Sequence, residues 1–168
     1  FICSKVSEHA KNNICNILFI CTHNSRRSQF AQVFAHLAFE YFQLNNFNSY
    51  SCGSEQTSIH QNTLQALKLF GFIIKRDDKI KIHVSDDSFL ECFSKTFHDE
   101  SIPRKNNFSI MTCSDADQNC PIIDGSIDRF SLPFDDPKTY DNTEFFLREY
   151  EKTGLQIATE IFYIFLKI

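Results

Sequence analysis

Residues 17–28 constrain the fold more than any other stretch of the chain. The stretch opens with an uninterrupted apolar run over 17–21, bounded by polar residues, which is typical of a buried parallel strand. A polar loop follows, and apolar residues then recur at helical spacing over 29–42. A strand that passes through a short loop into a helix presents backbone N–H groups at the helix N-terminus, where oxyanions bind. The sequence therefore predicts an α/β unit built around an anion-binding loop.

This loop places a cysteine first and an arginine last, with five residues between Cys21 and Arg27. A helix N-terminus and an arginine both stabilise a thiolate, and a guanidinium binds two oxygens of a tetrahedral anion at once. Asn24 tolerates the left-handed backbone that such a loop needs, and Ser28 is placed to hydrogen-bond the Cys21 sulfur. We predict that Cys21 is a nucleophile. The alternative is a buried structural cysteine, with Arg27 on a solvated helix face.

The rest of the chain alternates between strand-like and helix-like segments. The sequence predicts strands over 47–52, 108–112 and 127–132, and helices over 58–70 and 143–168. Alternation of this kind indicates parallel strands joined by crossover helices. We therefore predict a doubly wound α/β fold, in which a central four-stranded parallel sheet carries helices on both faces.

The segment over 72–107 interrupts this alternation. Runs of alternating residues over 80–84 and 89–93 flank an Asp-Asp turn, which predicts a β-hairpin insertion. The insertion lies within a single domain expected to cover 16–168. Residues 1–15 are polar and irregular, and we expect them to form an N-terminal extension.

Composition narrows the functional class. Nineteen phenylalanines and no tryptophan predict a core rich in phenylalanine, and a net charge of −4 argues against nucleic acid or a membrane as the main partner. Seven cysteines without a secretory signal indicate a reducing, cytoplasmic compartment and chemical use of some thiols. The helix pattern over 143–168 carries too many charges to span a membrane. Because the chain begins with Phe1 rather than Met, we expect a fragment or a processed form.

Two further cysteines share the polar loop after the predicted strand over 108–112. Cys113 and Cys120 are separated by six residues. Parallel sheets place ligand sites at the carboxyl ends of their strands, so we expect these thiols to lie near Cys21. The spacing lacks the second close pair of a zinc site, so we expect no metal, and a permanent disulfide does not suit a reducing compartment. A redox-active pair is the prediction, and two unrelated cysteines are the alternative.

An Asp-Asp-Pro sequence over 135–137 follows the last predicted strand. A carboxylic acid on a loop that faces the anion protonates a leaving oxygen, and in a hydrolase it then activates water. We predict that Asp136 has this role, with Asp135 as an assistant or a cap. Taken alone, the same residues fit an ordinary turn.

In this order, the three segments resemble the low-molecular-weight protein tyrosine phosphatase superfamily. The resemblance covers about residues 16–168, and the string CSDADQNCP at 113–121 resembles the redox segment of thioredoxin-coupled arsenate reductases. It implies that Cys21 is the nucleophile, that Cys113 is the resolving cysteine and that Cys120 is the terminal one. The oxyanion-binding residues that it implies form the rest of the loop: Thr22, His23, Asn24, Ser25, Arg26, Arg27 and Ser28.

The same resemblance implies an arsenate reductase that needs no bound cofactor and takes its electrons from thioredoxin. The rival hypothesis is a phosphatase that hydrolyses phosphotyrosine or another phosphomonoester through a phosphocysteine, and a third is a binding module without turnover. Lys138 and Thr139 stand where the phosphotyrosine enzymes commonly carry adjacent aromatic residues. His23 replaces a common glycine, and Arg26 replaces a cysteine or a small residue. The Arg26 charge is expected either to attract the anion or to point to solvent.

Overall fold

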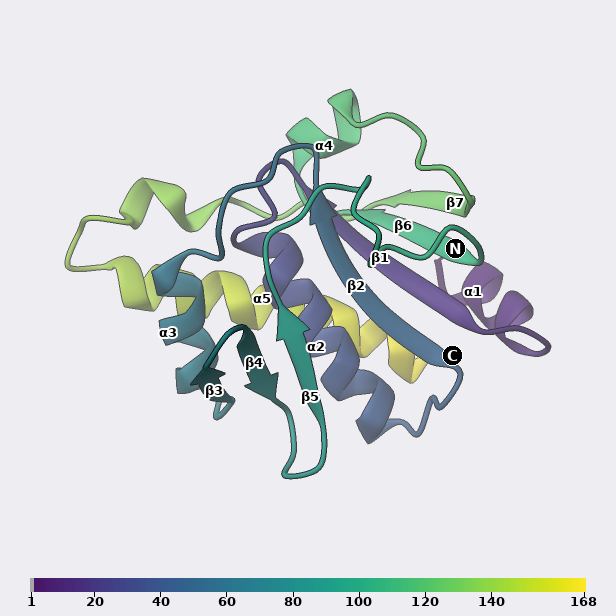
Figure 1. The fold of residues 1–168 in the computed structure, drawn as a ribbon, viewed down its shortest axis with the longest axis horizontal. Helices are drawn as coiled ribbons and strands as arrows, with labels where there is room; N and C mark the ends of the chain where they lie inside the picture. The colour runs from purple at the N-terminus through teal and green to yellow at the C-terminus, as the bar shows by residue number, and fades with distance from the viewer. Residues whose placement is uncertain (1) are drawn as a thin grey trace.

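A four-stranded parallel sheet forms the centre of the computed structural model, which describes residues 2–168 (Figure 1). Its strands are Cys15–Cys21 (β1), Phe47–Gly53 (β2), Asn107–Met111 (β6) and Ser126–Ser131 (β7), in the order β2-β1-β6-β7. Every neighbouring pair is parallel, so the carboxyl ends of all four strands meet at one edge. The predicted α/β fold with four central parallel strands is confirmed.

Helices and loops cover both faces of this sheet. The helices are Ile2–Ala10 (α1), Arg27–Tyr41 (α2), Gln61–Leu69 (α3), Ser114–Asn119 (α4) and Phe146–Leu166 (α5), with a short 3-10 helix at Pro137–Tyr140 (η1). Along β1, Ile17 and Phe19 pack in the larger core with α2 and α5, whereas Leu18 and Ile20 pack in a second core on the α4 side. This alternation is why the β1 sequence is apolar from Ile17 to Cys21.

The insertion is a three-stranded antiparallel sheet of Ile73–Arg76 (β3), Ile80–His83 (β4) and Phe89–Cys92 (β5). In the view of Figure 1 it lies in front of α2 and α3. The predicted hairpin corresponds to β4 and β5, whereas β3 was not predicted. Most of β3 is exposed, so its residues do not alternate between apolar and polar in a way that reveals a strand.

Helix α2 joins the two sheets. It has buried residues on every side because it is enclosed by the central sheet, α5 and the insertion. The Phe34 ring on α2 lies 5.2 Å from that of Phe70 and 5.7 Å from that of Phe72, near the start of the insertion. His36 Nε2 on the same helix is 2.9 Å from Ser88 Oγ in the turn before β5. The core is rich in phenylalanine, as predicted.

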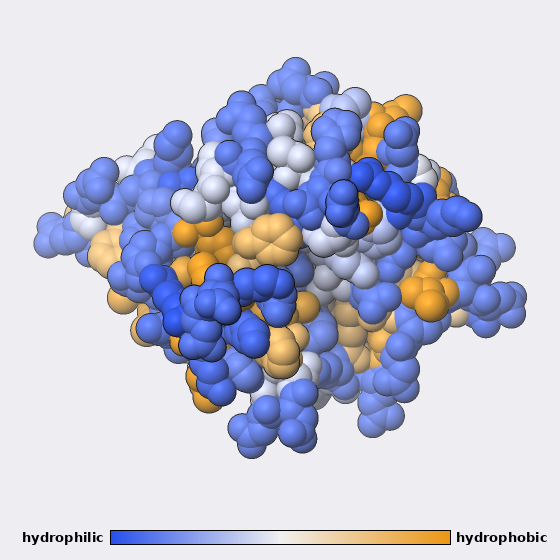
Figure 2. Space-filling model, viewed as in Figure 1, coloured by the Kyte–Doolittle hydropathy of each residue, from blue (hydrophilic) through white to orange (hydrophobic). Residues whose placement is uncertain are grey.

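The segment predicted as an N-terminal extension packs on the domain through α1. Val6 is fully buried, and its carbonyl oxygen lies 3.9 Å from the thiol of Cys15 at the start of β1. Phe1, on which the prediction of a fragment rests, lies outside the described residues. Within 2–168, none of the helices has the length and apolar character needed to cross a membrane. Figure 2 shows a largely hydrophilic face with separate apolar patches.

Replacing Phe34 with Ala should lower the free energy of unfolding by about 3–5 kcal/mol, because the ring is 3% exposed and its loss leaves a cavity between α2 and the insertion. Urea unfolding followed by circular dichroism measures the change. Phe145→Ala is the matched control, since that ring is 52% exposed. A loss of equal size in both variants would contradict the role given to α2.

Candidate active site

Cys21 lies at the carboxyl end of β1, directly before the loop that enters α2. Its side chain is 3% exposed, and its Sγ atom is 3.0 Å from Ser28 Oγ in the first turn of α2. The Asn24 side chain donates to the same Ser28 oxygen at 2.9 Å, and its backbone is left-handed with φ 46°. The Cys21–Ser28 contact and the conformation of Asn24 are as predicted. The thiol is therefore fixed against the N-terminus of a helix, where a thiolate is stabilised.

A glycine allows β2 to run close beside this loop. A Cβ atom at Gly53 would lie 2.5 Å from the Thr22 carbonyl oxygen, 2.8 Å from that of Cys21 and 2.9 Å from the Asn24 nitrogen. All three atoms belong to the backbone, so they have little freedom to move away. Only glycine fits at this position, and it fixes the course of the loop from outside.

The segment that leaves the insertion supports the loop from the same side. Lys95 donates its backbone N–H to the Asn24 side-chain oxygen at 2.9 Å, and the Ser94 hydroxyl donates to the His23 carbonyl at 3.1 Å. Gln29 on α2 donates to the carbonyls of Asn24 and Phe93, at 3.1 and 3.2 Å. The insertion therefore holds the anion-binding loop in place.

Arg27, the first residue of α2, binds the loop that carries Asp136. One terminal nitrogen is 2.5 Å from Asp136 Oδ2, and the other donates to the Phe134 carbonyl at 3.1 Å. The Arg27 Nε atom is buried without a hydrogen-bond partner among the described residues. An orphaned donor of this kind costs about 1–3 kcal/mol, and an oxyanion at the loop would supply an acceptor.

Cys113 lies beside this loop, at the start of α4. It is 1% exposed, and its sulfur accepts the Ala116 N–H at 3.3 Å, as an N-cap. Its sulfur is also 3.7 Å from the Thr22 hydroxyl, which donates to Asp115 at 2.6 Å. The Thr22 hydrogen bond, together with one from Asn119, lowers the pKa of Asp115. The loop and the N-terminus of α4 are therefore in direct contact.

Four cysteines belong to one buried cluster on this side of the sheet. Cys21, Cys113 and Cys120 are joined in it by Cys52, the neighbour of Ile20 in the β1–β2 pairing. Burial raises the pKa of Cys120 and of Cys52, and at Cys120 the positive charge of Arg129 opposes the effect. Among residues 2–168, no set of three or more His, Cys, Asp or Glu side chains is arranged to hold a metal ion.

Comparison with known proteins places this geometry in a family. The chain is 31% identical to an arsenate reductase of Staphylococcus aureus (strain Newman) over 146 residues, which are 87% of this chain and 94% of that protein. The chain belongs to the arsenate reductase family. It is also 32% identical to arsenate reductase 2 of Staphylococcus saprophyticus over 129 residues, 77% of this chain and 83% of that one. No protein-family model matches the sequence.

Solved structures agree with this assignment at the level of the fold. A mutant of YwlE from Bacillus subtilis superposes with a TM-score of 0.59 at 18% identity, over 90% of this chain and 97% of that one. An arsenate reductase in its phosphate-binding state gives a TM-score of 0.52 at 19% identity, over 89% of this chain and 98% of that one. The predicted resemblance to the low-molecular-weight phosphatase superfamily, in its arsenate reductase branch, is confirmed.

Arg26 is one of the two positions predicted to depart from the family pattern, and its side chain points away from the loop. Its Nε atom donates to the Tyr150 hydroxyl at 2.5 Å, and its guanidinium forms an ion pair with Asp141. Tyr150 in turn donates to Asp141, and His60 Nε2 lies 3.4 Å from the same carboxylate. Burial alone would lower the pKa of Arg26, but these partners raise it.

This placement corrects the expectations for the Arg26 side chain. The side chain is 11% exposed, so it does not point to solvent, and its charge is paired inside the protein rather than turned toward an anion. His23, the other departure, is 41% exposed and 3.3 Å from Glu55. Ser25 donates to the Ser58 carbonyl at 2.7 Å. Several loop side chains are therefore bound to other segments, which leaves the backbone N–H groups to meet an anion.

Sequence reasoning missed Gly53, Ser94, Lys95 and Cys52. The one available signal for Gly53 was its position directly after the strand predicted over 47–52. Cys52 is the last residue of that strand, which would have placed it at the same edge of the sheet as Cys21. Nothing local distinguishes Ser94 or Lys95, because their partners lie 71 residues earlier in the chain.

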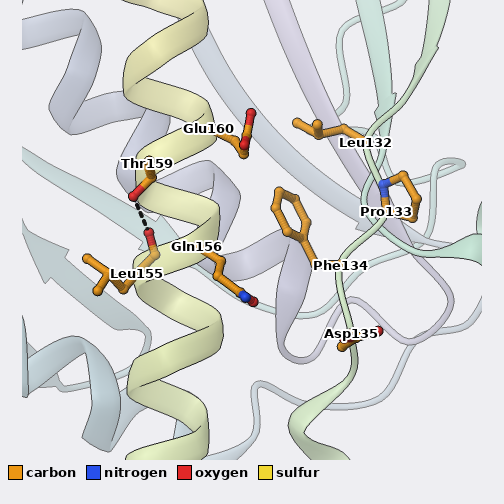
Figure 3. Close-up of a pocket in the computed structure, with 8 residues that line it drawn as sticks. All are labelled: Leu132, Pro133, Phe134, Asp135, Leu155, Gln156, Thr159 and Glu160. Carbon is orange, nitrogen blue, oxygen red and sulfur yellow. Dashed lines mark hydrogen bonds between the residues drawn. The ribbon is translucent and has the colours of Figure 1, made fainter.

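A groove beside the Asp136 loop is separate from this site. Figure 3 shows it between the loop and α5. Its lining residues are Leu132, Pro133, Phe134, Asp135, Leu155, Gln156, Thr159 and Glu160. Neither Cys21 nor Arg27 lines it, so it is not the oxyanion site.

Arg26→Met should lower the free energy of unfolding by about 3 kcal/mol, because the change leaves the Asp141 carboxylate, 15% exposed, without its buried counter-charge. Urea unfolding at neutral pH measures the loss. Lys79→Met is the matched control, since its ion pair with Glu91 is exposed, and we expect no measurable change. Equal stability of Arg26→Met and the wild type would show that the buried pair contributes nothing net.

Proposed function

We propose that this protein reduces arsenate to arsenite through a relay of Cys21, Cys113 and Cys120. The observation that carries the proposal is the contact between the redox segment and the anion-binding loop, where the Cys113 sulfur lies 3.7 Å from the Thr22 hydroxyl. A phosphatase needs the loop and an acid but no second and third thiol. The comparison with relatives also favours a reductase over a phosphatase, because the relatives with about 31% identity are named arsenate reductases.

The first step forms a bond between sulfur and arsenic. Arsenate binds to the backbone N–H groups over 22–28 and to the Arg27 guanidinium, which exchanges Asp136 for the anion. The Cys21 thiolate attacks arsenic, and an arsenate oxygen leaves as water with a proton from Asp136. Arsenic is still pentavalent in this adduct.

The second step transfers the electron pair. The Cys113 thiolate attacks the Cys21 sulfur, and the sulfur–arsenic bond breaks with both electrons remaining on arsenic. Arsenite, now trivalent, departs, and a Cys21–Cys113 disulfide is formed. Burial of both sulfurs in one cluster favours this exchange over attack by outside thiols.

In the third step, Cys120 attacks Cys113 and releases the Cys21 thiolate. Cys113 and Cys120 cap opposite ends of α4, so the helical rise separates them by about 10 Å. A disulfide needs Cα atoms within about 7 Å of each other, so α4 has to open before the Cys113–Cys120 bond forms. An external dithiol, proposed to be thioredoxin in the cytoplasm, then reduces this bond, and no bound cofactor is required.

Arsenate should oxidise the fully reduced protein, and phosphate should not. After one equivalent of arsenate under nitrogen, the free thiols are alkylated, and peptide mass spectrometry locates the disulfide. We expect the peptide that carries Cys113 and Cys120 to lose two hydrogens. Seven free thiols in the presence of arsenate would refute the reductase proposal and favour the phosphomonoesterase, to be assayed with a phosphotyrosine analogue.

Cys120→Ser should stop the relay after its second step. We expect one arsenite per enzyme, an accumulated Cys21–Cys113 disulfide, and at least a 100-fold loss of multiple turnover with thioredoxin. Cys92→Ser is the matched control, because Cys92 is also buried, at 1% exposed against 6% for Cys120, but lies in the other core. Full multiple turnover by Cys120→Ser would exclude Cys120 from the relay.

A further inference from the structure

Arg129, on β7, binds the C-terminal end of α4 with an unusual number of contacts. One terminal nitrogen donates to the Cys120 carbonyl at 2.6 Å and to that of Pro121 at 3.5 Å. The other donates to the carbonyls of Asp117 at 2.5 Å and Ala116 at 3.0 Å. It also lies 3.8 Å from the Asp117 carboxylate. A single side chain therefore gathers four carbonyls of the segment that carries the terminal cysteine.

Helix α4 depends on such support because it is only six residues long. Isolated helices shorter than about 12 residues are marginal in water. At its N-terminal end, the Cys113 and Asp115 side chains hold it to the loop through Thr22. At its C-terminal end, the Ala116 carbonyl also accepts the Cys120 N–H at 3.0 Å, whereas the last carbonyls of a helix lack helical partners. The positive charge of Arg129 complements the helix dipole there.

We propose that Arg129 is a positioning residue for the relay, a latch that keeps α4 wound while Cys113 and Cys120 are thiols and lets go when their disulfide forms. The inference rests on the proposed function, because the relay is what requires α4 to open. The oxidation removes two electrons and two protons from the thiols and forms one sulfur–sulfur bond. That balance holds for the test below, where glutathione disulfide accepts the electrons and protons. In the enzyme, the Cys120 thiolate attacks Cys113 in the Cys21–Cys113 disulfide, so the Cys113–Cys120 bond forms, the Cys21–Cys113 bond breaks and the electron pair leaves on Cys21.

The latch has a thermodynamic consequence. Contacts that exist only in the reduced, wound form stabilise that form relative to the disulfide. They therefore raise the reduction potential of the pair and make its disulfide easier to reduce. Arg129 thus favours the return of the enzyme to its reduced state by an external dithiol, at the cost of a slower third step.

Hydrogen exchange of the fully reduced protein tests the hold on the helix without any catalysis. In Arg129→Met, the amides over 116–120 should exchange about tenfold faster than in the wild type. Arg104→Met is the matched control, since Arg104 donates to the carbonyls of Phe97 and His98, at 3.1 and 2.8 Å, and to none of α4. Unchanged exchange over 116–120 in Arg129→Met would overturn the proposal.

Equilibration with glutathione tests the link to oxidation. Arg129→Met should raise the equilibrium constant for forming the Cys113–Cys120 disulfide about tenfold, a shift of about 30 mV to more negative potential. The reduction potential of Arg129→Lys should lie between those of the wild type and Arg129→Met, because an ammonium keeps the charge but not the fork of donors. A wild-type potential in Arg129→Met would overturn the latch even if exchange became faster.

The two measurements separate this proposal from the proposed function. If the wild type forms no Cys113–Cys120 disulfide in glutathione, the relay fails as a mechanism, and the latch fails with it as a redox device. If the disulfide forms and arsenate reduction proceeds, but Arg129→Met matches the wild type in both measurements, only the latch is wrong.

Discussion

The proposed activity depends on one requirement: the backbone N–H groups over 22–26 must be free to face an anion. For that to hold, the side chains of these residues have to be satisfied elsewhere. Thr22 binds Asp115 at α4, Ser25 binds the segment before α3, and Arg26 binds Asp141 and Tyr150. Each side chain ties the loop to a different element, so a short polar loop organises most of the surrounding fold.

The same arrangement accounts for the proposed anion site in a protein whose net charge is −4. Arg26 and Arg27 are adjacent in sequence, but each is neutralised by its own aspartate, Asp141 or Asp136. Only the Arg27 pair lies in the segment proposed to supply the acid. Because its partner is 31% exposed and that of Arg26 is 15% exposed, the Arg27 pair is the easier of the two for an incoming anion to exchange.

Sequence reasoning succeeded where the signal is local. The apolar run of β1, the periodicity of α2 and the two cysteines after β6 are all written within short windows, and parallel topology then brings their ends to one edge. It failed where the cause is distant. Arg26 finds Asp141 and Tyr150 at separations of 115 and 124 residues, so no window around the loop reveals that its charge is buried. Strand β3 was missed for another reason: it is mostly exposed, so its sequence does not alternate between apolar and polar residues.

The antiparallel insertion also limits how this family member can vary. An insertion on a surface is normally free to shrink or disappear among relatives. Here its exit segment supplies hydrogen bonds from Ser94 and Lys95 to the loop after Cys21, so a deletion would remove support from beneath the proposed nucleophile. We expect changes in length to be tolerated best at the exposed turns over 77–79 and 85–87, where no such support is lost. The insertion is therefore a structural part of the domain, because the loop after Cys21 depends on it.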